Sequence, residues 1–220
     1  MAKKYQIPFN KRPAYLTNKK VDATGKRYKV PSVTQVLGVI GNPEGLINWA
    51  IRETIKLIDW DKRQVGDYTE LRDWYADIGT TAHRHMEVLL EKGTPDLLTE
   101  GFDQKLIDAA QNSIGAFELW LERHEVEPLY IEEVLVSDTY ELGGTADLIA
   151  TVDGVVEVID FKTGTKLNKH KLQVAAYFML AQDAGIHVDQ CRMVYGHRNK
   201  KSGDNQLQEV IVYKDEIEEL

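Results

Sequence analysis

Cysteine is almost absent from this 220-residue sequence, in which Cys191 is the only one. A single thiol excludes an internal disulfide framework, a cysteine-rich zinc site and a four-cysteine iron–sulfur cluster. Long hydrophobic runs are missing as well, since no stretch approaches the roughly 18–20 apolar residues that a membrane-spanning helix needs. The first residues are polar and basic, without the apolar region of a secretory signal. We therefore expect a cytoplasmic protein with no membrane partner.

Several well-known catalytic motifs are missing too. The sequence has no Gly-x-x-x-x-Gly-Lys-Ser/Thr phosphate loop, so it contains no ATP-binding motif of its own. It has neither the His-Glu-x-x-His pair of metalloproteases nor the Gly-x-Ser-x-Gly turn of serine hydrolases. What is present, with 43% apolar and 28% charged residues, is the composition of an ordinary globular protein.

The net charge of −8 disfavours a polyanionic partner at first sight. The charge is unevenly distributed, however. Residues 1–30 carry nine bases against one acid, or +8, and the other 190 residues carry 18 bases against 34 acids, or −16. Such asymmetry can mark a nucleic-acid contact region, and it can equally mark a solvated basic tail.

No internal repeat, low-complexity tract or flexible linker divides the chain, and its length suits one substantial core. We expect a single domain over residues 1–220. It would consist of a basic segment at 1–30, a mainly helical part at 31–127 and a β-rich core at 128–220. The predicted class is α/β, with a central mixed sheet flanked by helices and a helical N-terminal elaboration.

The part before Pro128 is mainly helical in its pattern. A short β excursion at 14–30 turns at 23–26, and then Ser32 and Gln35 form a capping-box pattern that opens a helix. Further helices are predicted at about 44–58, at about 71–89 after a cap at Asp67 and Glu70, and at about 102–124.

After Pro128 the pattern changes to that of strands. Stretches rich in β-branched and aromatic residues predict strands at 129–137, 144–152, 155–162, 190–197 and 206–213. One helix at about 168–184 interrupts them, with Asn168 as its expected N-cap and Gly185 at its C-terminal end.

The strands at 144–152 and 155–162 carry the most informative side chains. Asp153-Gly154 between two apolar runs is a strong signal for a two-residue hairpin turn. If those two residues are the whole loop, Asp147 lies directly opposite Asp160, with Cβ atoms roughly 5 Å apart. Lys162 projects from the same face as Asp160, and Glu157 projects from the other.

Two facing carboxylates repel each other unless a proton or a cation offsets their charge. Two acids and a lysine at one strand end are typical of a divalent-metal hydrolytic site. The acids hold a hard cation, and the lysine orients water or stabilises the charge that develops on a phosphate. The alternative is a purely structural cluster in which Lys162 neutralises both acids.

In this combination the chain resembles the PD-(D/E)XK nuclease superfamily, in particular its RecB-type branch, which includes many phage and mitochondrial DNA exonucleases. The core motif of that family is an acid, a gap of hairpin length, and then acid-x-Lys. Asp147, Asp160 and Lys162 match it.

Three flanking motifs extend this resemblance over residues of about 28 to 198. The RecB-type Gly-x-x-x-His helix motif is matched by Gly79–His83, and its Gln-x-x-x-Tyr motif by Gln173–Tyr177. Pro-Ser-Val-Thr at 31–34 resembles the opening of phage and mitochondrial-type members. The motifs occur in the order that the family shows.

The resemblance implies a restriction-endonuclease-like core and a Mg²⁺- or Mn²⁺-dependent deoxyribonuclease that leaves a 5′-phosphate. His83, Asp147, Asp160 and the backbone carbonyl of Phe161 would hold the metal, and Lys162 would position the attacking water. Gln173 and Tyr177 share a helical face, where they would position the acids or contact DNA; otherwise they are ordinary surface polar groups.

A further acid could join the metal. Glu87 lies one helical turn after His83 on the same face. Glu132 and Glu133 are adjacent in a strand and point to opposite faces, so only one can contribute, and Glu133 is our expectation. Basic side chains that could follow a phosphate backbone, or be plain exposed loops, are Lys166, Lys169, Lys171, Arg198, Lys200 and Lys201.

The function that we expect is an exonuclease acting on DNA ends in phage-type recombination, replication or genome processing. Its partner would be DNA, together with a replication or recombination protein. Two alternatives stay open: a structure-specific or nicking endonuclease, and a DNA-binding subunit that kept the fold and lost catalysis.

Overall fold

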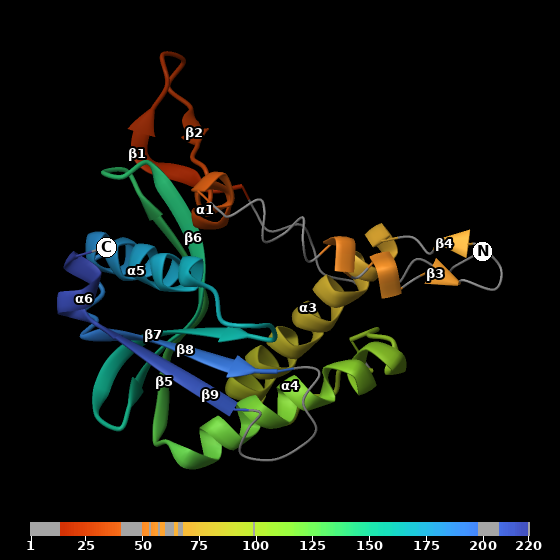
Figure 1. The fold of residues 1–220 in the computed structure, drawn as a ribbon. Coiled ribbons are helices and arrows are strands. Elements are labelled where there is room, and N and C mark those ends of the chain that lie inside the picture. The colour runs from red at the N-terminus through yellow and green to blue at the C-terminus, as the bar shows by residue number, and fades with distance from the viewer. Residues whose placement is uncertain are drawn as a thin grey trace.

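The structure is a computed structural model, and it describes residues 14–40, 50–52, 54–56, 58–59, 64–65, 68–98, 100–197 and 207–219. Its centre is a five-stranded mixed sheet with the order β5-β6-β7-β8-β9 (Figure 1). All neighbouring strands are antiparallel except β7 and β8, which are parallel. The strands are β5 (Val126–Ser137), β6 (Leu142–Val152), β7 (Val155–Lys162), β8 (Gln190–Gly196) and β9 (Leu207–Tyr213).

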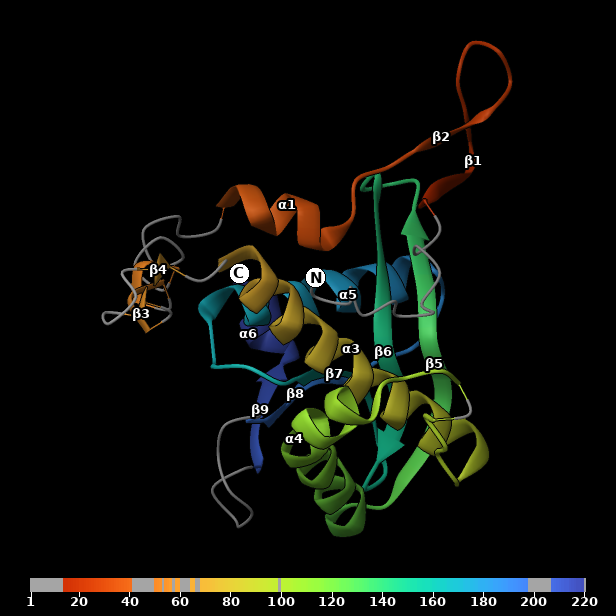
Figure 2. The same cartoon turned by 90° about the vertical axis from the view of Figure 1, so that its right-hand side faces the viewer.

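Helices cover both faces of this sheet (Figures 1 and 2). On one face, α3 (Tyr68–Lys92) and α4 (Gln104–Arg123) pack through a cluster that includes Ala82, Phe117 and Trp120. On the other face, α5 (Asn168–Asp183) packs together with α1 (Val33–Ile40) and α6 (Lys214–Glu218). The predicted α/β class, with a central mixed sheet between helices, is confirmed. None of the described helices is both long and apolar enough to cross a membrane.

Two small hairpins complete the described fold. β1 (Leu16–Val21) pairs with β2 (Arg27–Lys29), as the β excursion at 14–30 predicted, and β3 (Ile58–Asp59) pairs with β4 (Gln64–Val65). Of the helix expected at about 44–58, residues 50–52 and 54–56 are helical, whereas Ile58 begins β3. The rest of that helix, and the expected cap at Asp67, lie outside the described residues.

Three helix-end signals in the sequence fall on described residues; two are confirmed and one is wrong. The Ser32 amide donates to Gln35 Oε1 at 2.8 Å and the Gln35 amide donates to Ser32 Oγ at 3.1 Å, which is the predicted capping box. Gly185 follows α5 with φ +79° and ends it as predicted. The prediction for Asn168 was wrong: the N-cap is Leu167, which has no side-chain cap, and Asn168 is already the first helical residue.

Candidate metal centre

Asp147 and Asp160 meet where the β6–β7 ladder opens. The ladder runs from Val152↔Val155 to Leu148↔Ile159, which is the register predicted from the Asp153-Gly154 turn. One step further along, Asp147 lies across from Asp160. Instead of a backbone pair, the Phe161 amide donates a 2.8 Å hydrogen bond to Asp147 Oδ2. The side chain of Asp147 therefore occupies the opening between the two strands.

His83 reaches Asp147 from α3. Its Nδ1 lies 3.4 Å from Asp147 Oδ1. Gly79, one turn earlier, faces Thr163, since a Cβ added at Gly79 would lie 3.4 Å from Thr163 Oγ1, an ordinary van der Waals distance. Thr163 directly follows Lys162, so this contact brings the histidine-bearing helix to the end of β7.

Glu132 of β5 is the third member of the group. One ligand atom from each of His83, Glu132 and Asp147 lies within 4.8 Å of the other two. The β5–β6 register explains this, because Ile131 pairs with Leu148 and Glu133 with Ala146, which leaves Glu132 across from Asp147. Glu132 also has φ +49°, a backbone conformation that costs free energy for any residue except glycine.

Two acids that the sequence offered as further ligands lie elsewhere. Glu133 is across from Ala146, so the acid beside His83 and Asp147 is Glu132, its neighbour. Glu87 instead forms an ion pair with Arg84, whose Nη1 lies 2.6 Å from Glu87 Oε1. Only the register between β5 and β6 distinguishes Glu132 from Glu133, and no signal local to the sequence reports it.

Asp160 is almost completely buried, with 1% of its surface exposed, and it contacts Lys162. Lys162 Nζ lies 2.5 Å from Asp160 Oδ2 and forms an ion pair with it. Burial raises the pKa of Asp160, and the Asp147 charge adds to this against the opposing effect of Lys162. Although burial also disfavours the Asp147 charge, His83, Lys162 and the Phe161 amide lower the pKa of Asp147.

These groups fit a divalent cation. Carboxylate oxygens and one imidazole nitrogen are ordinary ligands for such ions. His83 and Asp147 thus lie together, and the Phe161 amide joins β7 to Asp147, whereas Asp160 is not among the ligand atoms within 4.8 Å of one another. The structure adds Glu132 to this set.

Gln173 and Tyr177 lie beside the centre on α5. Gln173 Nε2 donates a 2.9 Å hydrogen bond to the Tyr177 hydroxyl. Tyr177 is buried and packs on Gly144 so closely that a Cβ at Gly144 would lie 2.5 Å from its Cε1. Burial raises the pKa of Tyr177, and Asp160 and Asp147 add to this effect, so the phenol stays neutral.

Three of the six candidate DNA-binding side chains lie within the described residues. Lys166 Nζ lies 5.6 Å from the centre of the Tyr195 ring, Lys169 is exposed, and Lys171 forms a 3.0 Å ion pair with Glu216. Arg198, Lys200 and Lys201 lie outside the described residues.

Comparison with known proteins identifies the family. The model of the PD-(D/E)XK nuclease superfamily matches residues 49–220. The match covers more than half of the chain, so this protein belongs to the PD-(D/E)XK nuclease superfamily. The members of this class are nucleases whose core is the helix-flanked mixed sheet described above.

Solved structures offer more distant likenesses. The crystal structure of SSO0001 is 17% identical, with a TM-score of 0.33, and the alignment covers 62% of this chain and 66% of that one. The crystal structure of LHK-Exo in complex with dAMP is 14% identical, with a TM-score of 0.34, and the alignment covers 66% and 80%. The chain thus spans slightly less than two thirds of SSO0001. A search of curated protein sequences found no match.

Proposed function

We propose that this protein is a Mg²⁺- or Mn²⁺-dependent deoxyribonuclease of the RecB-type branch, acting on DNA ends as an exonuclease. Phage-type recombination, replication or genome processing is the setting that we propose, with DNA as the substrate. The observation that carries the proposal is the convergence of His83, Asp147, Asp160 and Lys162 at the open end of the β6–β7 ladder. Membership of the nuclease superfamily supports it.

The metal would be held by His83, Glu132, Asp147 and Asp160, together with the Phe161 carbonyl. When bound, it would supply a Lewis acid that neutralises negative charge on the phosphate and promotes ionisation of water. Two neighbouring buried acids destabilise each other's charged forms, because burial and mutual repulsion both raise the free energy of the carboxylates. A bound cation would offset this cost.

The protein's own groups would orient the reaction. The ammonium group of Lys162 would position the attacking water and stabilise the extra negative charge of the phosphate in the transition state. Asp160 would hold Lys162 in place through their 2.5 Å contact. The Phe161 amide would fix Asp147 by its hydrogen bond, and Gln173 would hold the Tyr177 ring beneath the Gly144 backbone.

The test is digestion of end-labelled single- and double-stranded DNA with Mg²⁺ or Mn²⁺. Asp160→Ala and Lys162→Ala are each expected to lower the cleavage rate by at least about a hundredfold, because each removes a group that acts on the reacting phosphate. Lys105→Ala, an exposed lysine at the start of α4, is the matched control and should cleave at the wild-type rate.

Two results would contradict the proposal at different levels. Wild-type protein that binds DNA and cleaves none with either metal would be a DNA-binding subunit with the nuclease fold. Cleavage of covalently closed circular DNA at the rate of linear DNA would indicate an endonuclease, because such a circle has no ends.

A further inference from the structure

The β1–β2 hairpin projects from the rest of the molecule beyond the end of the central sheet where β6 begins (Figures 1 and 2). Residues 16–29 contain five bases, Lys19, Lys20, Lys26, Arg27 and Lys29, against the single acid Asp22. Asp22 is used within the turn, where its Oδ1 accepts hydrogen bonds from the amides of Thr24 at 2.8 Å and Lys26 at 3.1 Å. The hairpin is therefore a basic projection on an acidic protein.

The hairpin is held in place by two acids of the β5–β6 turn. Asp138 accepts hydrogen bonds from the consecutive amides of Asn18, Lys19 and Lys20, at 2.6, 2.6 and 3.0 Å. Glu141 accepts from Lys20 Nζ at 2.9 Å and from the Tyr28 hydroxyl at 2.8 Å. Three backbone amides around one carboxylate fix the strand itself, so this anchor remains when the lysine side chains of the hairpin are replaced.

This docking leaves most of the basic side chains without an acidic partner. Lys19, Lys26, Arg27 and Lys29 are exposed, and within the described part of the chain no ion pair joins any of them to an acid. Four neighbouring cations on a fixed support are a surface suited to a polyanion.

Both ends of the hairpin are joined to the strand that carries Asp147. Before β1, the Tyr15 hydroxyl lies 2.8 Å from Thr145 Oγ1, and after β2, the Gly143 amide donates to the Pro31 carbonyl at 3.0 Å. Gly143 is required for this approach, because a Cβ there would lie 2.5 Å from the Tyr15 side chain. Asp147 follows Gly143 by four residues, or about 13 Å of extended strand.

We propose that the β1–β2 hairpin is a DNA-binding arm that contacts the phosphate backbone of duplex DNA bound at the metal centre. This inference rests on the proposed nuclease function, since the metal centre fixes where the DNA lies.

The test measures binding of a labelled blunt duplex of about 20 base pairs, without metal, by fluorescence anisotropy over a series of salt concentrations. The triple variant Lys19→Glu, Lys26→Glu and Arg27→Glu reverses three charges of the arm. Its matched control reverses three exposed lysines elsewhere: Lys92→Glu, Lys105→Glu and Lys214→Glu. We expect the arm variant to lose at least about tenfold in affinity and about three units of the slope of log K against log salt.

A second variant tests the position of the arm rather than its charge. Asp138→Ala removes the acceptor of the three amide hydrogen bonds and makes the protein more positive by one charge. If charge alone mattered, this variant would bind DNA at least as tightly as wild type. An arm held in position predicts weaker binding, and a melting curve close to that of wild type would show that the fold is intact.

The outcomes separate this inference from the proposed function. The proposal of a DNA-binding arm would be overturned if the arm variant and the control triple variant had equal affinities and equal salt slopes. It would also be overturned if Asp138→Ala bound DNA as tightly as wild type or more tightly. Arm-dependent binding by a protein that cleaves no DNA would support the arm and overturn the nuclease. Cleavage by wild type with arm-independent binding would overturn the arm alone.

Discussion

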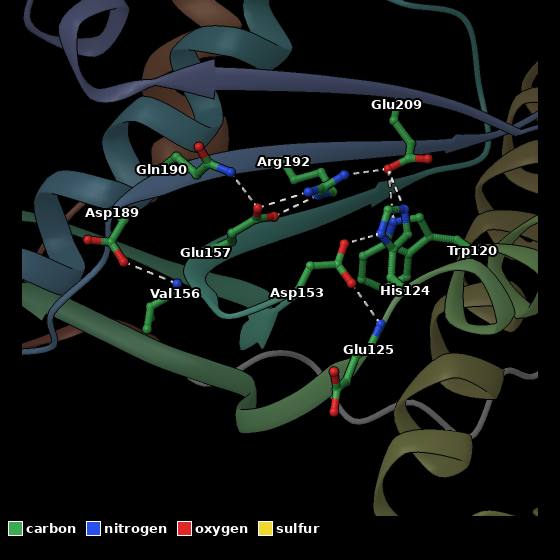
Figure 3. A network of polar contacts seen from close by, with 10 residues as sticks. All are labelled: Trp120, His124, Glu125, Asp153, Val156, Glu157, Asp189, Gln190, Arg192 and Glu209. Carbon is green, nitrogen blue, oxygen red and sulfur yellow. Dashed lines mark hydrogen bonds and ion pairs between the residues drawn. The ribbon is translucent and has the colours of Figure 1, made fainter.

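Arg192 of β8 forms a bidentate ion pair with Glu157 of β7, with Nε and Nη2 donating to the carboxylate at 2.6 and 2.9 Å. Glu157 is completely buried, and Gln190 supplies a further hydrogen bond to it. Arg192 Nη1 also donates to Glu209, and Glu209 in turn contacts Trp120 and His124. These contacts form a polar network that joins β7, β8, β9 and α4 (Figure 3). As the strand alternation predicted, Glu157 thus lies apart from the metal centre.

Breaking this pair is expected to destabilise the fold. Arg192→Met leaves the buried Glu157 charge without its main partner, which costs about 3–5 kcal/mol of the free energy of unfolding. The double variant with Glu157→Leu removes both charges and should lose less than Arg192→Met alone. Urea unfolding measures wild type, both single variants and the double variant, and a double variant as unstable as the sum of the two single variants would argue against an ion pair.

Gly144 is predicted to tolerate no side chain. Gly144→Ala places a methyl group against the Tyr177 ring and the Val33 side chain, and it should cost about 1–3 kcal/mol of unfolding free energy. Gly115→Ala in α4 is the control, because no atom lies within 4 Å of its added Cβ. That control should stabilise the protein by about 0.5–1 kcal/mol. Thermal unfolding distinguishes the two, and equal midpoints would contradict the close packing.

Glu132 is expected to lower the stability of the metal-free protein and to strengthen metal binding. Glu132→Gly relieves the cost of φ +49°, so the metal-free protein should gain about 1 kcal/mol of unfolding free energy. The same change removes a carboxylate from the group with His83 and Asp147, so Mn²⁺ affinity should fall by at least about tenfold in calorimetric titration.

The neighbouring Glu133→Gly is the matched control for that experiment. It places a glycine within a strand at a residue outside the metal centre, so it should lower stability by about 0.5–1 kcal/mol and leave Mn²⁺ affinity unchanged. If Glu133→Gly weakened Mn²⁺ binding as much as Glu132→Gly, the β5 register would not decide the ligand.

His170 predicts a pH dependence of stability. It is buried, with Nδ1 3.0 Å from the Tyr195 hydroxyl, and burial together with Lys162 and Lys169 lowers its pKa to about 4. The unfolded chain, with the ordinary pKa of about 6.5, binds the proton first as pH falls. The free energy of unfolding should therefore decrease between pH 6.5 and 4, by up to about 3 kcal/mol.

The measurement is urea unfolding at several pH values for wild type and His170→Asn. The variant has no titrating group at this position, so its stability should fall less between those pH values. His187→Asn is the control, because the His187 side chain is 77% exposed. A His170→Asn profile parallel to that of wild type would contradict the assignment.

Local signals predicted the elements that local chemistry determines. Asp153 and Gly154 both have positive φ, as a two-residue hairpin turn requires, and the register that places Asp147 across from Asp160 follows from that turn. Ser32 and Gln35 form their capping box for the same reason, since both partners lie within one helical turn. Asn168 fails as a cap because Leu167 already has the extended conformation that the N-cap position requires.

What the sequence did not predict depends on contacts between distant segments. The choice between Glu132 and Glu133 is made by the pairing of β5 with β6. The docking of the basic hairpin is a further case, because Asp138 lies about 120 residues from the amides that it holds. Spacing along one element cannot report either of these.

The open end of the β6–β7 ladder also has a consequence for folding fidelity. Strand side chains alternate between faces, so a slip of one residue would turn Leu148 and Ile159 from the core toward the opposite face. The same slip would separate Asp147 from Asp160. Because Ile149 and Val158 already pack against the helices on that other face, both faces would stay apolar after the slip. Loss of the acidic pair, rather than loss of the core, would be the main consequence of a misregistered ladder.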